Sequence, residues 1–479
     1  MSQKSIRKNY IYNVTYQLLV LITPLITTPY VSRTIGAAGI GTYSFAESIV
    51  TYFTLFAAMG TAAYGQREIS YVQDDKEKRT EVFWNTAILR GISTFVWLLL
   101  YEVYVFCFCD DITIYSIFAM NVVTIAFDIT WLFQGMEEFG RIVFRNAVFK
   151  ILNILYIFTF IHSSDDLVIY VLGMCLLPLL GMFSLWPFLH KIVDKPDWKK
   201  VRPFTNLGVV LSMFIPFIAI SIYTVLDKTM LGLFTDTKDE NGYYEQALEL
   251  SKAALTLVTA LGTVMAPRVG YYYEKQDMDA VKKYIYRSYQ FVWFLGIPLC
   301  FGLISISANI VPWFYGNGFE KVIPLLSILS FLIPIIGISN VTGIQYMMPT
   351  KRQNMLTVSV LTGAVVNFVF NFIMIPHWYS IGAAMASVLA ETVITVVQIM
   401  IMRKELSPWM IISCSGHYWL AGVIMFGILC GMGRYLTSSI LHSLIMIICG
   451  GVIYSVLLLV MKDEFFIKQI KFIFRKISE

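Results

Sequence analysis

Residues 207–233 read LGVVLSMFIPFIAISIYTVLDKTMLGL, and this stretch decides the fold. The apolar run contains Pro216 and is interrupted by the adjacent charges Asp227 and Lys228. A short polar turn follows, and a second apolar run ends at Arg268. A helix of about 20 mostly apolar residues crosses a bilayer, and charges inside such a helix are costly and mark functional sites. The stretch therefore predicts a membrane-spanning hairpin that carries functional charges.

The composition of the whole chain is that of a polytopic membrane protein. Of the 479 residues, 57% are hydrophobic and only 14% are charged, whereas about 25% are charged in soluble domains. The net charge of +5 does not indicate nucleic-acid binding, because most basic residues lie in short loops between apolar runs. The seven cysteines show no metal-ligand or disulfide spacing and are interpreted as small core residues. No loop exceeds about twenty residues and no nucleotide-binding loop is present, so we expect no soluble catalytic domain and no ATP hydrolysis.

Fourteen apolar runs are long enough to cross a membrane. All are predicted to be helices, because lipid offers backbone groups no hydrogen-bond partners. The runs are 10–31, 39–64, 82–106, 112–134, 142–161, 167–189, 206–233, 243–266, 284–308, 322–346, 355–375, 380–402, 415–433 and 440–461. Of the 36 Lys and Arg residues, 28 lie on the side of both termini and 4 on the other side. This bias predicts that both termini are cytoplasmic.

An internal repeat predicts two lobes. The first hairpin carries Gly41, Tyr43, Ala46, Gly60-Thr61 and Arg67, and the later hairpin carries Gly242, Tyr244, Ala247, Gly262-Thr263 and Arg268. The first helix of each hairpin also has a mid-span proline, Pro24 or Pro216. Recurrence after six spans in the same orientation is typical of transporters built from repeats. We therefore predict an N-lobe at 1–203 with spans 1–6, a C-lobe at 204–403 with spans 7–12, and spans 13–14 with a cytoplasmic tail at 404–479.

Polar residues inside the spans follow continuous helical faces, which predicts a wet interior between the helices. Mid-helix charges cost about 3 kcal/mol each on insertion scales. The predicted cavity cations are Arg90, Lys150, Lys228 and Lys252, and the predicted carboxylates are Glu47, Asp128, Asp227 and Glu391. For charges near the outer surface, such as those of Lys228 and Lys252, an alternative is a side chain that reaches the interface.

Aromatic residues on the same faces are candidates for sugar contacts. The residues concerned are Trp97, Tyr101 and Trp131. Sugars hydrogen-bond at their edges and present C–H faces to rings, so a cavity with cations and aromatic rings suits an anionic glycan. The alternative for these three residues is an aromatic belt at the membrane interface.

Several motifs resemble those of bacterial polysaccharide flippases. These are Tyr30-Val31-Ser32-Arg33, Gly39-Ile40-Gly41-Thr42-Tyr43 and Leu226-Asp227-Lys228-Thr229-Met230-Leu231-Gly232. With the fourteen runs, the chain looks like a member of the multidrug/oligosaccharidyl-lipid/polysaccharide exporter superfamily, and within it of the polysaccharide transporters for O-antigen or capsule repeat units. The resemblance implies an all-α fold with two pseudo-symmetric six-helix lobes in a V around a central cationic cavity, plus two C-terminal helices.

The resemblance also implies the function. Such a protein moves undecaprenyl-pyrophosphate-linked oligosaccharide from the inner to the outer leaflet of the bacterial cytoplasmic membrane by alternating access, with a polysaccharide polymerase and export machinery as further partners. We expect no cofactor, and we hypothesise that a carboxylate such as Glu47, Asp128 or Glu391 binds a proton or Na⁺ to couple transport. Alternatives are a multidrug and toxin extrusion antiporter, a lipid II flippase, or a membrane polymerase or acyltransferase. The deep basic residues Arg90 and Lys150 argue against extrusion of organic cations.

Overall fold

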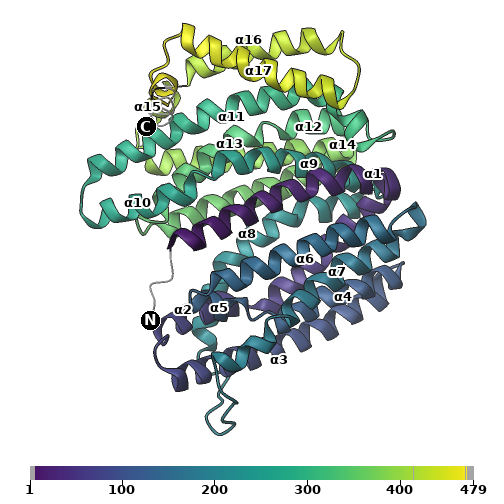
Figure 1. Cartoon of the computed structure of the whole chain (residues 1–479), viewed down its shortest axis with the longest axis vertical. Helices are drawn as coiled ribbons and strands as arrows, with labels where there is room; N and C mark the ends of the chain where they lie inside the picture. The colour runs from purple at the N-terminus through teal and green to yellow at the C-terminus, as the bar shows by residue number, and fades with distance from the viewer. Residues whose placement is uncertain (1–5, 414, 470, 472–479) are drawn as a thin grey trace. The chain divides into compact units, whose positions relative to one another are not determined.

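The computed structural model describes residues 6–413, 415–469 and 471, and within them it contains helices and no strand. The helices of the first half are α1 (Ile6–Ala58), α2 (Thr61–Tyr71), α3 (Lys76–Phe108), α4 (Ile112–Phe127), α5 (Thr130–Gly135), α6 (Phe139–Phe160), the 3-10 turn η1 (Ser164–Asp166), α7 (Leu167–Phe183), the 3-10 turn η2 (Trp186–Lys191) and α8 (Leu207–Phe234) (Figure 1). The helices of the second half are α9 (Asp239–Thr259), α10 (Gly262–Glu274), α11 (Met278–Tyr315), α12 (Val322–Leu329), α13 (Leu332–Asn340), the π-helical segment η3 (Val341–Met347), α14 (Gln353–Met402), α15 (Pro408–Ser413), α16 (Gly416–Gly433) and α17 (Ile440–Val460).

The apolar runs coincide with these helices, which confirms an all-α membrane protein. Ten helices of the described chain are long and apolar enough to cross a membrane. Two of them join two predicted runs each: α1 is kinked at Gly36, where φ is 76°, and α14 is kinked at Tyr379, where φ is 51°. Dividing these two kinked helices would give twelve crossings, and the predicted runs 206–233 and 243–266, which form α8 and α9, are not among the ten. The count of fourteen spans therefore stays a prediction.

The chain separates into two compact units, Met1–Thr229 and Met230–Glu479. The first 23 residues of α8 therefore pack with the N-terminal unit. The predicted lobe boundaries at 203/204 and 403/404 rest on the sequence repeat and stay predictions.

In the N-terminal unit, α3 packs against α1 and α4, and α4 packs against α7. The buried side chains between them are mostly apolar or aromatic and include Tyr101 and Phe118. The opposite face of α3 is also apolar but exposed, with Phe95, Leu99 and Phe106. Exposed apolar side chains on a helix of this length are expected to face lipid.

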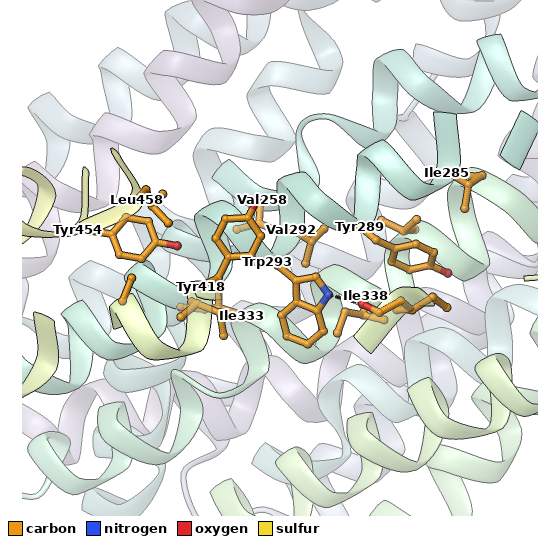
Figure 2. Packing of buried hydrophobic residues seen from close by; sticks show 14 of the residues in the cluster. Val258, Ile285, Tyr289, Val292, Trp293, Ile333, Ile338, Tyr418, Tyr454 and Leu458 are labelled. Atoms are coloured by element: carbon orange, nitrogen blue, oxygen red, sulfur yellow. Dashed lines mark hydrogen bonds between the residues drawn. The ribbon is translucent and has the colours of Figure 1, made fainter. Parts of the chain in front are cut away.

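The core of the C-terminal unit is built around α11, and α16 and α17 pack directly on it. Trp293 of α11 lies between the side chains of Tyr418 and Tyr289 in Figure 2, and its indole N–H donates to the Ile411 carbonyl at 2.9 Å. Tyr454 of α17 donates to the Phe294 carbonyl at 3.1 Å. Buried aromatic side chains with paired polar atoms combine a large apolar area with a fixed orientation. The two C-terminal helices are therefore an integral part of this unit.

The repeated Gly-Thr motif marks the same structural event in both units. Gly60 precedes α2, with φ of 73°, and a Cβ there would lie 3.0 Å from the Val210 carbonyl oxygen. In the second copy α10 begins at Gly262, where a Cβ would lie 2.8 Å from the Asn340 side-chain oxygen. In both places a neighbouring segment approaches too closely for a side chain. The physical reason for the repeat is thus a tight start to a short helix that follows a long one.

Candidate functional site

The Arg90 side chain is the most completely enclosed charge of the N-terminal unit's spans. It lies on α3 and is 2% exposed. Its Nε donates to the Ile125 carbonyl at 2.5 Å, and a terminal nitrogen lies 2.9 Å from an Asp128 carboxylate oxygen. The other terminal nitrogen donates to the Thr61 hydroxyl at 3.3 Å. Each of the three guanidinium nitrogens therefore has a protein partner.

Asp128 occupies a break between two helices. The helix α4 ends at Phe127 and α5 begins at Thr130, and Asp128 between them has an extended backbone, with φ of −74° and ψ of 102°. One carboxylate oxygen of Asp128 accepts from the Thr130 backbone N–H at 2.9 Å and from its hydroxyl at 2.5 Å. Arg90 meanwhile donates to the Ile125 carbonyl in the last turn of α4, which also accepts from the Asp128 backbone N–H at 3.4 Å. The ion pair therefore holds an interruption inside the predicted fourth span.

A second pair joins α8 to the latter half of α1. Lys228 Nζ lies 3.7 Å from a Glu47 carboxylate oxygen, and the Tyr43 hydroxyl donates to the other oxygen at 3.3 Å. The adjacent Thr229 hydroxyl donates to Ser48 at 3.0 Å and lies 3.1 Å from the Tyr52 hydroxyl. A polar cluster thus joins α8 to α1, and its α8 residues, Lys228 and Thr229, are the last two residues of the N-terminal unit.

The predicted site residues fall into three groups. The structure joins Arg90 with Asp128, and Lys228 with Glu47. Two further predicted residues, Lys150 and Asp227, are half-buried in the N-terminal unit, and Lys252 and Glu391 belong to the C-terminal unit, the first exposed and the second half-buried. The assignment of all these residues to a substrate cavity stays a prediction.

The three predicted sugar contacts have different surroundings. Trp97 is half-buried and stacks on Phe56, with ring centroids 4.8 Å apart. Tyr101 is buried and donates to the Tyr115 carbonyl at 2.7 Å. Trp131 is buried and stacks on Phe83, with centroids 5.5 Å apart. Tyr101 and Trp131 present no ring face outward in this structure, so their contact with sugar stays a prediction that requires another conformation.

Sequence reasoning did not single out a charged pocket at the start of α3. The pocket holds about 430 Å³ and lies between α3 and the segment 194–201. Lys76 pairs with Asp194 at 2.6 Å, and Lys200 pairs with Glu77 at 2.5 Å. The Glu77 carboxylate raises the pKa of the Lys200 ammonium. The only signal in the sequence is that both segments are rich in charges of both signs, which is common in exposed loops.

The described part of the chain contains no cluster of side chains that could bind a metal ion. No three His, Cys, Asp or Glu side chains of residues 6–413, 415–469 and 471 cluster as metal ligands would. Coupling of transport to a proton or Na⁺ through a single carboxylate stays a prediction.

The fold and the paired charges define a multi-pass helical membrane protein of the transporter class. The chain belongs to the polysaccharide biosynthesis protein family, whose model matches residues 6–272. It is 24% identical over 411 residues to a protein of Escherichia coli (strain K12) provisionally named an O-antigen transporter, covering 84% of this chain and 97% of that one. It is 23% identical over 268 residues to a provisionally named low-salt glycan biosynthesis flippase of Haloferax volcanii, covering 56% of each chain. The resemblance found in the sequence is confirmed.

Solved structures show the same fold. A lipid II flippase in an inward closed conformation matches with a TM-score of 0.74 and 16% identity, over 95% of this chain and 99% of that chain. An inward-facing multidrug resistance transporter of the multidrug/oligosaccharidyl-lipid/polysaccharide exporter superfamily matches with a TM-score of 0.58 and 13% identity, over 86% and 98%. The all-α fold predicted from the resemblance is therefore confirmed, and its fourteen helices and two six-helix lobes stay predictions.

Proposed function

We propose that this protein is a flippase that moves undecaprenyl-pyrophosphate-linked oligosaccharide repeat units from the inner to the outer leaflet of the bacterial cytoplasmic membrane. The observation that carries the proposal is the family match over residues 6–272. The names of the relatives, O-antigen transporter and glycan biosynthesis flippase, support the same substrate class. The fold shared with a lipid II flippase over 95% of the chain supports the same kind of movement.

The physical problem that such a protein solves is the passage of a sugar chain through hydrocarbon. Each hydroxyl without a hydrogen-bond partner costs several kcal/mol in an apolar medium. A wet groove that is open to lipid on one side removes this cost, while the prenyl tail stays in the bilayer. A membrane potential that is negative inside favours outward movement of the diphosphate by about 2.3 kcal/mol per charge per 100 mV. Alternating access supplies the groove to each side in turn.

The ion pairs suggest how a diphosphate is handled. In this proposal Lys150 attracts the diphosphate to the N-terminal unit, and Lys252 is a cation of the C-terminal unit with the same role there. Arg90 and Lys228 exchange their carboxylate partners for phosphate oxygens. The carboxylates released in that step, Asp128 and Glu47, are then free to take up a proton. Exchange of one anion for another leaves no buried cation without a partner, which keeps the energetic cost low. A polysaccharide polymerase and export machinery receive the product, and both termini face the cytoplasm.

The experiment that tests the proposal measures the repeat unit in the outer leaflet of the native host. The host lacks its own copy of the gene and receives wild-type protein, Lys150→Ala or the control Lys200→Ala at matched expression. Lys150 is half-buried in α6, whereas Lys200 is an exposed residue of a loop. We expect wild type and Lys200→Ala to restore the repeat unit and Lys150→Ala to reduce it strongly.

Two outcomes contradict this. If wild type leaves the outer leaflet without repeat unit and instead raises resistance to cationic drugs, the protein is an extrusion pump. If Lys150→Ala transports as well as wild type, the flippase function stands but Lys150 has no part in it.

A further inference from the structure

A pocket in the C-terminal unit combines one arginine with three tyrosines. It holds about 300 Å³ and lies between α10 and the start of α11, lined by Pro267, Arg268, Tyr271, Tyr272 and Tyr284. The rings of Tyr272 and Tyr284 stack with centroids 5.4 Å apart, and Tyr271 meets Tyr272 edge-on at 5.3 Å. The pocket is open, since Arg268 is exposed and Tyr271 is 55% exposed.

Two cations border this pocket. Arg268 is part of its lining, and Lys275 Nζ lies 4.3 Å from the centre of the Tyr271 ring. Of the nearby carboxylates, Glu274 pairs with Lys351 at 2.7 Å, and Asp277 keeps its charge but is held as the cap of α11 by the Ala280 backbone N–H at 3.0 Å. The local charge at the pocket is therefore positive.

The internal repeat supplies a direct comparison. Arg268 corresponds to Arg67 of the first copy, which pairs with the next residue, Glu68, at 2.7 Å. In the second copy the next residue is Val269. Within the part of the chain that the structure describes, Arg268 forms no ion pair with a carboxylate. Within one residue of the same place in the repeat, seven residues after Gly60 and six after Gly262, one unit thus carries an arginine that is paired with a carboxylate and the other carries an arginine that is not.

We infer that the pocket of Arg268 and its three tyrosines binds the diphosphate of the lipid-linked substrate, at the end of the C-terminal unit that the charge bias predicts to be cytoplasmic. This rests on the proposed function. The guanidinium forms two parallel hydrogen bonds with a phosphate group, and the lysine ammonium supplies a second, mobile charge. The tyrosine hydroxyls donate to remaining phosphate oxygens, and the ring faces pack against sugar C–H groups. Phospholipid headgroups carry the same phosphate chemistry but only one such group, whereas two cations here suit two phosphates.

The test uses the purified full chain in nanodiscs of phosphatidylcholine, and the probe is radiolabelled undecaprenyl diphosphate without sugar. The variants are Arg268→Ala, Arg268→Lys and the matched control Arg67→Ala. We expect Arg268→Ala to weaken binding about tenfold or more, because a hydrogen bond to a charged group is lost. The affinity of Arg268→Lys for the probe is expected to lie between those of Arg268→Ala and wild type. Lysine keeps the positive charge but lacks the two parallel N–H donors of the guanidinium. Arg67→Ala should bind within about twofold of wild type, because its charge is already neutralised by Glu68.

A milder variant, with its melting midpoint measured beside its binding, separates a loss of binding from a general loss of folding. Tyr271→Phe removes only one hydroxyl from an exposed ring, and we expect a reduction of about threefold in binding with an unchanged melting midpoint, consistent with the loss of one hydrogen bond. Excess phosphatidylglycerol in the nanodisc is expected not to displace the probe.

Each contrary result has a separate meaning. If Arg268→Ala and Arg67→Ala bind the probe as wild type does, the inference about this pocket is wrong and the flippase function is untouched. If phosphatidylglycerol competes at concentrations similar to those of the probe, the pocket is a site for anionic lipids in general, and the inference is again wrong. If wild type itself does not bind undecaprenyl diphosphate, the substrate of the proposed function is wrong.

Discussion

Two ion pairs of the N-terminal unit have the same chemistry and different surroundings. Arg90 and Asp128 lie 2.9 Å apart, with side chains that are 2% and 18% exposed. Lys228 and Glu47 lie 3.7 Å apart, with side chains that are 11% and 39% exposed. The first pair is short and enclosed, and the second is longer and open on the carboxylate side. The surroundings and not the charges decide how firmly each pair is held.

The partners of Arg90 point in the same direction. Arg90 connects α3 to Thr61 at the start of α2. It also binds Ile125 in the last turn of α4 and Asp128 in the break that follows α4. Lys228 presents a single ammonium group, which is a point charge with rotatable donors. We conclude that the first pair is a brace between helices and that the second is the one that exchanges partners more easily.

Arg90→Ala is expected to have the largest effect of any change to the two pairs. It leaves the Asp128 carboxylate without the cation that neutralises it in a mostly buried place, which costs about 3 to 5 kcal/mol. We expect low abundance in the membrane, a strongly reduced melting midpoint and no transport. Abundance and the melting midpoint of the detergent-purified protein measure this.

The control for Arg90→Ala is the double variant Arg90→Met with Asp128→Leu, which removes both charges. Replacement of a buried pair by apolar side chains of similar volume is often close to neutral, so part of the abundance should return. An Arg90→Ala protein with wild-type abundance and melting midpoint would contradict the role of Arg90 as a brace.

Asp128→Asn is expected to have an intermediate effect. The amide oxygen still accepts from the Thr130 backbone N–H, and so the helix break keeps its local hydrogen bond. The charge that pairs with Arg90 is lost, and no proton can be taken up. We expect moderate destabilisation, by about 2 kcal/mol, with transport lost at near-normal protein level. Full transport by Asp128→Asn would exclude a coupling role for this carboxylate.

The helices themselves were readily predicted from the sequence. Hydrocarbon-length apolar runs have few alternatives in lipid: the run 82–106 falls inside α3, and the run 142–161 ends one residue beyond α6. The division between the runs 355–375 and 380–402 was predicted, and the kink at Tyr379 lies within it; the positive φ of this non-glycine residue was not predicted, because it has no signature in the sequence. It depends on tertiary contacts: the Glu240 side chain accepts from the Ser380 backbone N–H at 3.1 Å.

The sequence predicted which charged residues belong to the candidate site, but it did not predict which of them form pairs. All four residues, Arg90, Asp128, Lys228 and Glu47, were identified as charges inside apolar runs. Their pairing was not, because the partners lie 38 and 181 residues apart and only the packing of helices brings them together. The break at Asp128 was missed for a related reason: apolar residues continue on both sides of it, and its cause is the hydrogen bond with Thr130.

Substitutions in the second pair, Lys228 and Glu47, are expected to have smaller effects on stability than those in the first pair. Lys228→Met, Glu47→Gln and the double variant form a double-mutant cycle, and we expect a coupling energy on the order of 0.5 kcal/mol, because Glu47 is 39% exposed and the two atoms are 3.7 Å apart. Melting midpoints measure the cycle, and the outer-leaflet assay measures transport. A coupling energy as large as that of the pair of Arg90 and Asp128 would remove the distinction between brace and exchangeable pair.

Lys200→Ala is expected to have the smallest effect and supplies the exposed reference for both pairs. Lys200 lies 2.5 Å from Glu77, closer than either membrane pair, but the side chains are 54% and 78% exposed. The raised pKa of Lys200 means that its stabilising contribution is complete at neutral pH and is lost only as the pH rises through that raised pKa. Water and salt screen the pair, so we expect no resolvable change in melting midpoint at pH 7 in low or high salt. A large, salt-dependent loss of stability would mean that proximity outweighs burial, and the contrast between the two membrane pairs would then need another explanation.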